Sequence, residues 1–313
     1  MAFTLYTSAD AGAPVLTGAA GTLLALLHAC LVTGYGAKAA AGWSRPWLDA
    51  SGNLAVFKPN DAQDFFLHIN DAGPGAGTYK EARAHCGMTH DGAGNLGTRA
   101  PQNAGYPNGL FVRKSNTTDA TARDWFLYAD GKTAYLMIDP GDSAGRFLPF
   151  FAGKALAVSP IEAYPWIIAG TLSENYTSIS SSSHNAAYFL AEPGTYPNAF
   201  TPVQADGSGT GTGLRYAPAV GITGSTSPHL LGTLGPGAPG PRTGIAPLFD
   251  GLMTHDKEPR LRTRGLWSAY AAGGIGEGDT FSATIGGVLR SFVCRRVAFS
   301  GIYLFETSDT LDL

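Results

Sequence analysis

One segment near the N-terminus has the apolar spacing of an amphipathic helix. Its apolar residues recur at the i, i+3, i+4, i+7 and i+8 positions of a 3.6-residue period and so share one face: Leu23, Leu26, Leu27, Cys30 and Leu31. Thr17 is the predicted N-cap, and Gly34 is the predicted left-handed stop. We expect this helix to pack on its own domain, with a neighbouring subunit as the alternative.

The rest of the chain has the pattern of short strands separated by tight turns. Two apolar runs, 125–128 and 133–138, flank Asp130-Gly131, a dipeptide that suits a two-residue type I′ hairpin. Both runs are apolar at successive positions, which predicts that both of their faces are covered, as in a sandwich or an interface. A second hairpin is predicted over 280–294 around Gly286-Gly287. Residues 297–299, a turn at Ser300-Gly301 and residues 302–306 continue it as a meander. Further strands are expected at 65–70, 161–169 and 187–191.

The composition changes between residues 206 and 247, where 17 of 42 residues are Gly or Pro. An ordered Gly loses much backbone entropy, so this stretch cannot form a compact core alone. It is either a disordered linker or an extended arm that gains order by lying on neighbours. Spaced apolar residues such as Leu214, Leu230 and Ile245 suit an arm.

These patterns predict a mainly β protein of antiparallel sandwich or meander units, with one short N-terminal helix and an extended Gly/Pro-rich arm. We expect an N-terminal segment with a docking helix over 1–36 and a first β domain over 37–150. A second β domain over 151–313 contains the arm at 206–247. The tetrapeptide Met-Thr-His-Asp occurs at 88–91 and again at 253–256, which suggests an internal duplication; coincidence is the alternative.

Composition and charge exclude several classes of protein. With 44% apolar and 14% charged residues among 313, the chain is not intrinsically disordered. Its 21 basic and 24 acidic residues provide no overall field that would gather nucleic acid or an anionic membrane. Three widely separated cysteines do not form a disulfide framework, so we expect a reduced state. No basic residue precedes Lys38, and the apolar stretch 22–32 is too short to cross a bilayer, so we expect neither a secretory signal nor a membrane span.

Walker A, His-Glu-x-x-His and Cys-x-x-Cys are all missing from the sequence. Gly-x-Ser-x-Gly is matched once, by GDSAG at 141–145, but this match begins in a segment that a turn explains and no helix, which a nucleophile elbow needs, is predicted after it. We therefore predict no catalytic, cofactor-binding or metal-binding residues. Four possible metal ligands crowd into seven residues, but zinc sites usually need a second spaced pair, so a polar loop is expected: His85, Cys86, His90 and Asp91. Several carboxylates lack a spacing that would pair them for hydrolysis, and turn roles explain them: Asp139, Asp142, Glu162, Glu174 and Asp279.

Basic residues concentrate in one place, at Lys257, Arg260, Arg262 and Arg264. Alternate arginines on a strand would point to one side, either toward nucleic acid or an acidic partner, or as charges that guard an edge strand. Specific nucleic-acid recognition is not expected, because few aromatics for base stacking lie nearby. Other aromatics could serve a carbohydrate-binding surface: Trp43, Trp47, Tyr106 and Tyr196.

Several segments resemble a family of virion structural proteins of tailed bacteriophages and prophages. They are 6–43 (YTSADAGAPVLTGAAGTLLALLHACLVTGYGAKAAAGW), 66–75 (FLHINDAGPG), 112–138 (VRKSNTTDATARDWFLYADGKTAYLMI), 278–281 (GDTF) and 306–309 (ETSD). The family is defined by presence in particles rather than by chemistry, so the resemblance implies no site residues. The stretch 206–247 does not resemble the family's segments.

The resemblance implies a structural subunit of a tailed bacteriophage virion, in the tail or head–tail region, that acts by self-assembly. Its expected partners are copies of itself and other virion proteins, with possible contact to the host surface but none to membrane or to specific nucleic acid. We expect no enzymatic activity and no cofactor, and assembly in the host bacterial cytoplasm. The alternatives are a capsid decoration protein, a host-receptor or carbohydrate-binding module of the tail, and a hydrolase of the cell envelope.

Overall fold

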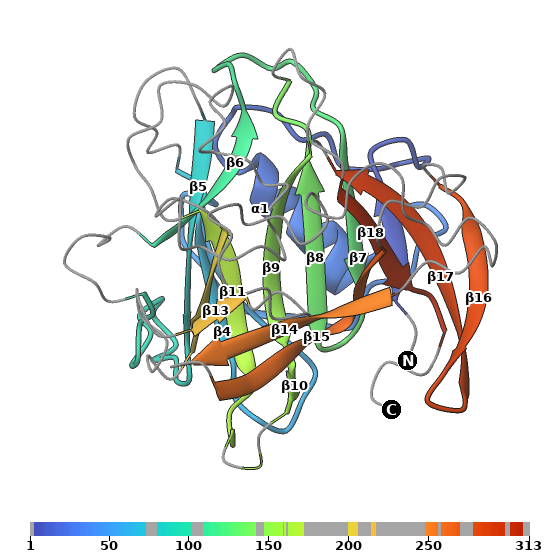
Figure 1. Ribbon diagram of the computed structural model, residues 1–313. Helices are drawn as coiled ribbons and strands as arrows, with labels where there is room; N and C mark the ends of the chain where they lie inside the picture. The colour runs from blue at the N-terminus through green and yellow to red at the C-terminus, as the bar shows by residue number, and fades with distance from the viewer. Residues whose placement is uncertain are drawn as a thin grey trace.

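The fold is mainly β and antiparallel, as the sequence pattern predicts (Figure 1). The computed structural model describes residues 3–72, 80–101, 109–141, 147–158, 160, 162–171, 200–205, 214–216, 248–255, 258–269, 278–297 and 301–308. Within these residues the chain forms an eleven-stranded sheet, a seven-stranded sheet and one short helical segment near the N-terminus.

The first sheet is antiparallel throughout and contains strands from the first two thirds of the chain. Its order is β1 (Thr4–Thr7), β7 (Trp125–Ala129), β8 (Thr133–Ile138), β9 (Leu148–Lys154), β11 (Trp166–Thr171), β6 (Leu110–Ser115), β5 (Lys80–Gly87), β4 (Phe66–Asn70), β3 (Leu54–Lys58) and β2 (Ser44–Leu48). Strand β12 (Phe200–Gln204) also pairs with β11. The domain boundary expected at residue 150 falls inside β9, and the strands β11 and β12 beyond it belong to this same sheet.

The second sheet has the order β13 (Leu214–Tyr216), β14 (Leu248–His255), β15 (Glu258–Ala269), β18 (Gly301–Glu306), β17 (Val288–Val297) and β16 (Thr280–Ile285), and β10 (Leu156–Ala157) also pairs with β15. The hairpin predicted around Gly286-Gly287 is confirmed. Both glycines adopt positive φ (59° and 81°), as a type I′ turn requires. The predicted meander is also confirmed, because β18 pairs with β17.

The predicted helix is present as α1 (Thr22–His28), and a π-helical turn, Ala29–Thr33, extends it. Gly34 ends it with φ 79°. The predicted N-cap is wrong: the cap residue is Gly21, and no side chain of its own turn caps the helix. Thr17 instead accepts the N–H of Ala19. Among the described residues, no helix is long and apolar enough to cross a membrane.

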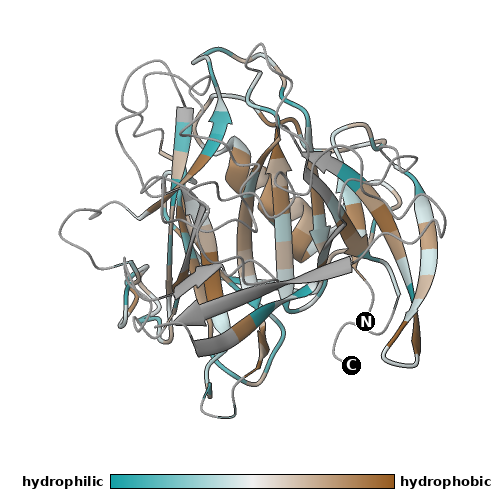
Figure 2. Ribbon diagram, in the orientation of Figure 1, coloured by the Kyte–Doolittle hydropathy of each residue, from teal (hydrophilic) through white to brown (hydrophobic). Residues whose placement is uncertain are grey.

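The first sheet lies between two covering layers. The apolar face of the helix packs on one side of it, in a core that includes Leu23, Leu27, Phe57 and Leu127. Figure 1 shows α1 behind β7 to β9, with β14 and β15 crossing in front. Hydrophobic colouring is concentrated on α1 and on the strands beside it (Figure 2). The helix therefore packs on its own chain, as expected.

A second core joins the two sheets. It contains residues of β7, β8, β9 and β11 together with residues of β15, β17 and β18. Tyr128 and Phe305, one from each sheet, stack with ring centroids 4.1 Å apart and planes 3° apart. Every residue of β7 and β8 is buried, because the helix covers one face and the second sheet covers the other. The covered faces predicted from the apolar runs are thus confirmed as a sandwich.

The turn between β7 and β8 differs from the predicted type I′ turn. The N–H of Asp130 donates to the carbonyl of Thr133 at 3.0 Å, which leaves Gly131 and Lys132 in the loop. Gly131 does not adopt the positive φ that the predicted turn needs. The Asp130 carboxylate accepts the N–H groups of Lys132 and Thr133, both at 2.9 Å, so a side chain stabilises this turn in place of special glycine conformations.

Two expected elements lie outside the described residues: the strand at 187–191 and nearly all of the Gly/Pro-rich arm. Only β13, at Leu214–Tyr216, is described within 206–247. The strand expected at 161–169 begins later, at Trp166.

Candidate functional site

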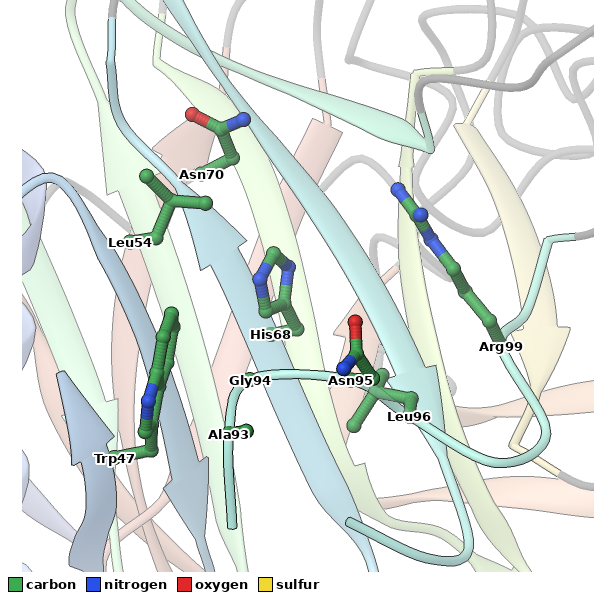
Figure 3. A pocket seen from close by; sticks show the side chains of 9 residues that line it. All are labelled: Trp47, Leu54, His68, Asn70, Ala93, Gly94, Asn95, Leu96 and Arg99. Atoms are coloured by element: carbon green, nitrogen blue, oxygen red, sulfur yellow. The ribbon is translucent and has the colours of Figure 1, made fainter. Parts of the chain in front are cut away.

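A cleft with a volume of about 470 Å³ opens on the face of the first sheet that is turned away from the helix (Figure 3). Nine residues from β2, β3, β4 and the segment after β5 line it: Trp47, Leu54, His68, Asn70, Ala93, Gly94, Asn95, Leu96 and Arg99. Figure 3 shows Trp47 and Leu54 on one side of the hollow, Arg99 on the other, and His68 between them. This cleft is the candidate binding site.

Strand alternation places the side chains of β4 on opposite faces of the sheet. Phe65, Leu67 and Ile69 are buried in the core beneath the helix. His68 and Asn70, at the intervening positions, therefore point outward into the cleft. The alternation of apolar and polar residues over 66–70 contains this signal, but by itself it predicts only a strand.

The cleft is built on one cross-strand row of side chains. In the sheet register, Trp47 of β2 lies opposite Val56, Val56 opposite His68, and His68 opposite His85 of β5. The rings of Trp47 and His68 are nearly parallel, with centroids 6.4 Å apart, and those of His68 and His85 are 6.2 Å apart. Nη2 of Arg99 lies 3.3 Å from Nδ1 of His85 and completes the row.

The loop after β5 closes one side of the cleft. The Asp91 carboxylate accepts the backbone N–H groups of Ala93 and Asn95, at 2.7 and 3.0 Å, and the side-chain amide of Asn95 at 2.7 Å. These hydrogen bonds lower the pKa of Asp91 to about 2. Gly94 (φ 96°) rests directly on Trp47: a Cβ at this position would lie 2.6 Å from the indole. The loop therefore packs on the aromatic side of the cleft.

The cleft is cationic at neutral pH and has no acidic lining residue. Burial, followed by the charges of Arg99 and His90, lowers the pKa of His68 to about 4, so its imidazole is neutral at pH 7. Arg99 supplies the positive charge. No carboxylate in the described ranges forms an ion pair with it.

Three lining side chains keep hydrogen-bonding groups directed at solvent in the hollow. The Asn70 side-chain oxygen accepts the N–H of Ala72 at 3.0 Å, which leaves its amide N–H groups for a ligand. Arg99 uses one nitrogen toward His85 and retains its other donors. The imidazole of His68 makes only ring contacts within the described chain. Convergent polar groups beside an aromatic wall are typical of a small-molecule site.

A second candidate surface is the hairpin of β16 and β17, which forms one edge of the second sheet. Its edge strand, Thr280–Ile285, alternates exposed and half-buried residues, and within the described residues it pairs only with β17. Leu289 on β17 is 65% exposed. Apart from Phe281, Ala283 and Ile285, which pack on the cluster around Phe292, the strand faces solvent.

The four clustered side chains that could have bound a metal are not brought together. His85 and Cys86 point to opposite faces of β5, and Cys86 is buried in the core beneath the helix. The ring nitrogens of His90 face the backbone N–H groups of Gly92 and Gly94, while Asp91 holds its own loop. No group of three possible ligands that could hold a metal occurs in the part of the chain that the structure describes.

The arginines expected to share one exposed side do not do so. Arg264 is 1% exposed and bonds the Asp130 carboxylate at 2.5 Å, which ties β15 of the second sheet to the hairpin turn of the first. Its strand is also not an edge, because β14 pairs with it on one side and β18 and β10 on the other. Both interpretations of Arg264, a nucleic-acid or partner contact and a guarded edge, are therefore wrong. The side chain of Arg260 and the residue Lys257 lie outside the described residues.

The structure describes some of the carboxylates predicted to lie in turns and some of the aromatic residues proposed for carbohydrate binding. Asp139 accepts the N–H of Gly141 at 2.8 Å, as its turn role predicts, and Glu162 accepts the N–H of Tyr164. Of the four aromatics proposed for carbohydrate binding, Trp43 is buried and donates to the carbonyl of Asp130. Trp47 does line the cleft. The remaining proposed residues are outside the described chain: Asp142, Glu174, Tyr106 and Tyr196.

The two Met-Thr-His-Asp segments lie in different settings. The first follows β5 and forms the start of the cleft loop, where the backbone of Gly97 bonds that of Thr89. Residues 253–255 of the second lie in β14, which pairs with β15 through His255, and Asp256 is outside the described residues. Internal duplication stays a prediction.

Comparison of the sequence with models of known protein families gives no match, and comparison with curated proteins gives none either.

Proposed function

We propose that this chain is a structural subunit of a tailed bacteriophage virion, in the tail or head–tail region, and that it assembles by adding the β16 edge to a neighbouring sheet. The segments that resemble virion proteins support the first part. The observation that carries the second is the chemistry of the sheet edges in the described residues.

Three of these edges carry the features that natural proteins use against strand addition. Strand β2 contains Arg45 and Pro46 and has an irregular register. Strand β1 is covered by Lys38, whose Nζ donates to the carbonyl of Leu5 at 2.9 Å. Strand β13 is only three residues long and contains Arg215.

Two further strands are paired on one side only within the described residues: β12 contains Pro202, and β10 is two residues long. The β16 edge has none of these features. Its six residues include no charge and no proline, and half of them are exposed. In a two-residue hairpin the residues flanking the turn bond each other, so Ile285 bonds across to β17 and the backbone groups of Thr284 and Ser282 face outward. The cross-strand bond from the N–H of Cys294 to the carbonyl of Asp279 agrees with this alternation. An uncharged edge with free backbone groups favours pairing with another chain.

The assembly step is tested by sedimentation velocity of the full chain over a wide concentration range. We expect concentration-dependent association that Thr284→Lys abolishes, because a lysine on the edge opposes strand addition. Ser282→Pro removes an outward N–H and has the same expected effect. Val15→Lys is the matched control, because Val15 is 63% exposed and lies far from this edge in the sequence. Equal association of wild type, Thr284→Lys and Ser282→Pro would contradict assembly through β16.

The virion assignment is tested by quantitative mass spectrometry of purified particles. About six or twelve copies per particle fit a ring of the tail or neck. Hundreds of copies would favour the capsid decoration protein, and absence from particles would refute a virion role. The carbohydrate-binding alternative is supported by a specific feature, the position of Trp47 in the cleft.

A further inference from the structure

We infer that the cleft of Figure 3 binds an acidic sugar, with the carboxylate of a hexuronate on Arg99 and its ring against His68 and the edge of the Trp47 indole. This inference rests on the cleft alone and does not depend on assembly through β16.

The charge of the cleft indicates an anion with a single negative charge. Arg99 is the one cation among the nine lining residues, and none of the nine is acidic. A guanidinium presents paired N–H donors that match a carboxylate. Because His68 is neutral at pH 7, it adds no second charge that a phosphate dianion would favour. Asp91, the nearest acidic residue of the loop, is occupied by Ala93 and Asn95.

The remaining surface of the cleft matches a sugar ring, which presents both apolar C–H groups and polar hydroxyls. The indole of Trp47 and the side chains of Leu54 and Leu96 form apolar walls suited to C–H groups. The Asn70 amide and the His68 imidazole point into the same hollow and suit ring hydroxyls (Figure 3). A volume of about 470 Å³ lies within the range of roughly 300–1,000 Å³ that is typical of small-molecule sites.

The test is a titration of the full chain with methyl β-D-glucuronide, with methyl β-D-glucoside as the neutral match and adenosine 5′-monophosphate as the competing class. Calorimetry gives affinities, and chemical-shift changes locate the site. We expect the glucuronide to bind at least about tenfold more tightly than the glucoside, a ratio that reflects the charge-assisted contact. Arg99→Gln should reduce this ratio to near one, and Trp47→Ala should weaken both sugars.

Arg45→Gln is the control, since Arg45 lies on β2 but does not line the cleft. It should leave glucuronide affinity unchanged. If Arg99→Gln fails to fold, the glucuronide-to-glucoside ratio of the wild-type chain still decides the matter. Any of three results would overturn the inference: equal binding of the two sugars, no binding of the glucuronide at about 20 millimolar, or preference for the nucleotide. None of these results alters sedimentation, so the two proposals fail independently.

Discussion

Lys114 and Asp71 form an ion pair from which solvent is completely excluded, beneath the N-terminus of α1. The same Asp71 carboxylate accepts the N–H of Leu23 at 2.8 Å and lies 3.4 Å from that of Leu24. Lys114 also donates to the carbonyl of Ala19 at 2.7 Å. A residue 48 positions away thus caps the helix and serves the purpose predicted for Thr17.

Asp71→Ala should lower the free energy of unfolding by roughly 3–5 kcal/mol, because it leaves the Lys114 ammonium buried without its counter-charge. Urea denaturation measures this loss. Burial raises the pKa of Asp71, so the ionised carboxyl is itself costly to bury. Asp71→Asn combined with Lys114→Met retains an acceptor for Leu23 and removes both charges, and it should recover at least half of the loss. If the double variant were as unstable as Asp71→Ala, the ion pair would not be the cause.

Arg264→Gln should destabilise the protein by about 3–5 kcal/mol, since the Asp130 carboxylate would remain buried between the sheets without its cation. Arg262→Gln, two residues along the same strand, should cost no more than about 1 kcal/mol because Arg262 is partly exposed. Thermal unfolding of the two variants measures the difference. Similar losses for both would mean that Arg264 does not join the sheets.

Gly94→Ala should displace Trp47, because the added methyl would lie within 2.6 Å of the indole. Gly92→Ala is the matched control: Gly92 also has positive φ, 80°, but no atom lies within 4 Å of the added methyl. The indole N–H resonance of Trp47 should therefore shift in Gly94→Ala and stay in place in Gly92→Ala. Equal shifts would indicate that backbone strain alone moves the loop.

The free energy of unfolding should fall as the pH drops from about 6.5 to 4, and His68 should account for part of the fall. Its pKa is about 4 in the folded chain and 6.5 when unperturbed, so in this interval the unfolded chain binds a proton that the folded chain does not. The contribution of His68 is at most about 3 kcal/mol, at about 1.4 kcal/mol per pH unit. Denaturation at several pH values should give a flatter profile for His68→Gln. A profile unchanged by that substitution would contradict the lowered pKa.

Local patterns predicted the elements whose stability depends on their own residues. The apolar stripe from Leu23 to Leu31 implies a helix with one buried face whatever it packs against. Gly286-Gly287 implies a tight hairpin, because few other residues adopt its positive φ. The turn at Asp130 was predicted in place but not in type. There the side chain competes for the backbone N–H groups, and dipeptide preference alone does not decide between these conformations.

The cleft could be predicted only in part. Alternation over 66–70 marks His68 and Asn70 as sharing one face of a strand. Their meeting with Trp47 and Arg99 depends on the register of β2 to β5 and on the loop that carries Ala93 to Arg99. Which residues meet in the cleft is set by pairing between segments that are distant in sequence, and no local pattern in the chain indicates that pairing.

By itself the sequence determined that the chain is mainly β, with one amphipathic helix near its start and tight glycine hairpins, because period and turn chemistry act between residues a few positions apart. Only the tertiary structure decided that Asp71 caps the helix, that Arg264 joins the sheets and that His68 faces a cleft. A buried charge is tolerated only beside its counter-charge, and that neighbour is set by how the sheets stack rather than by distance along the chain.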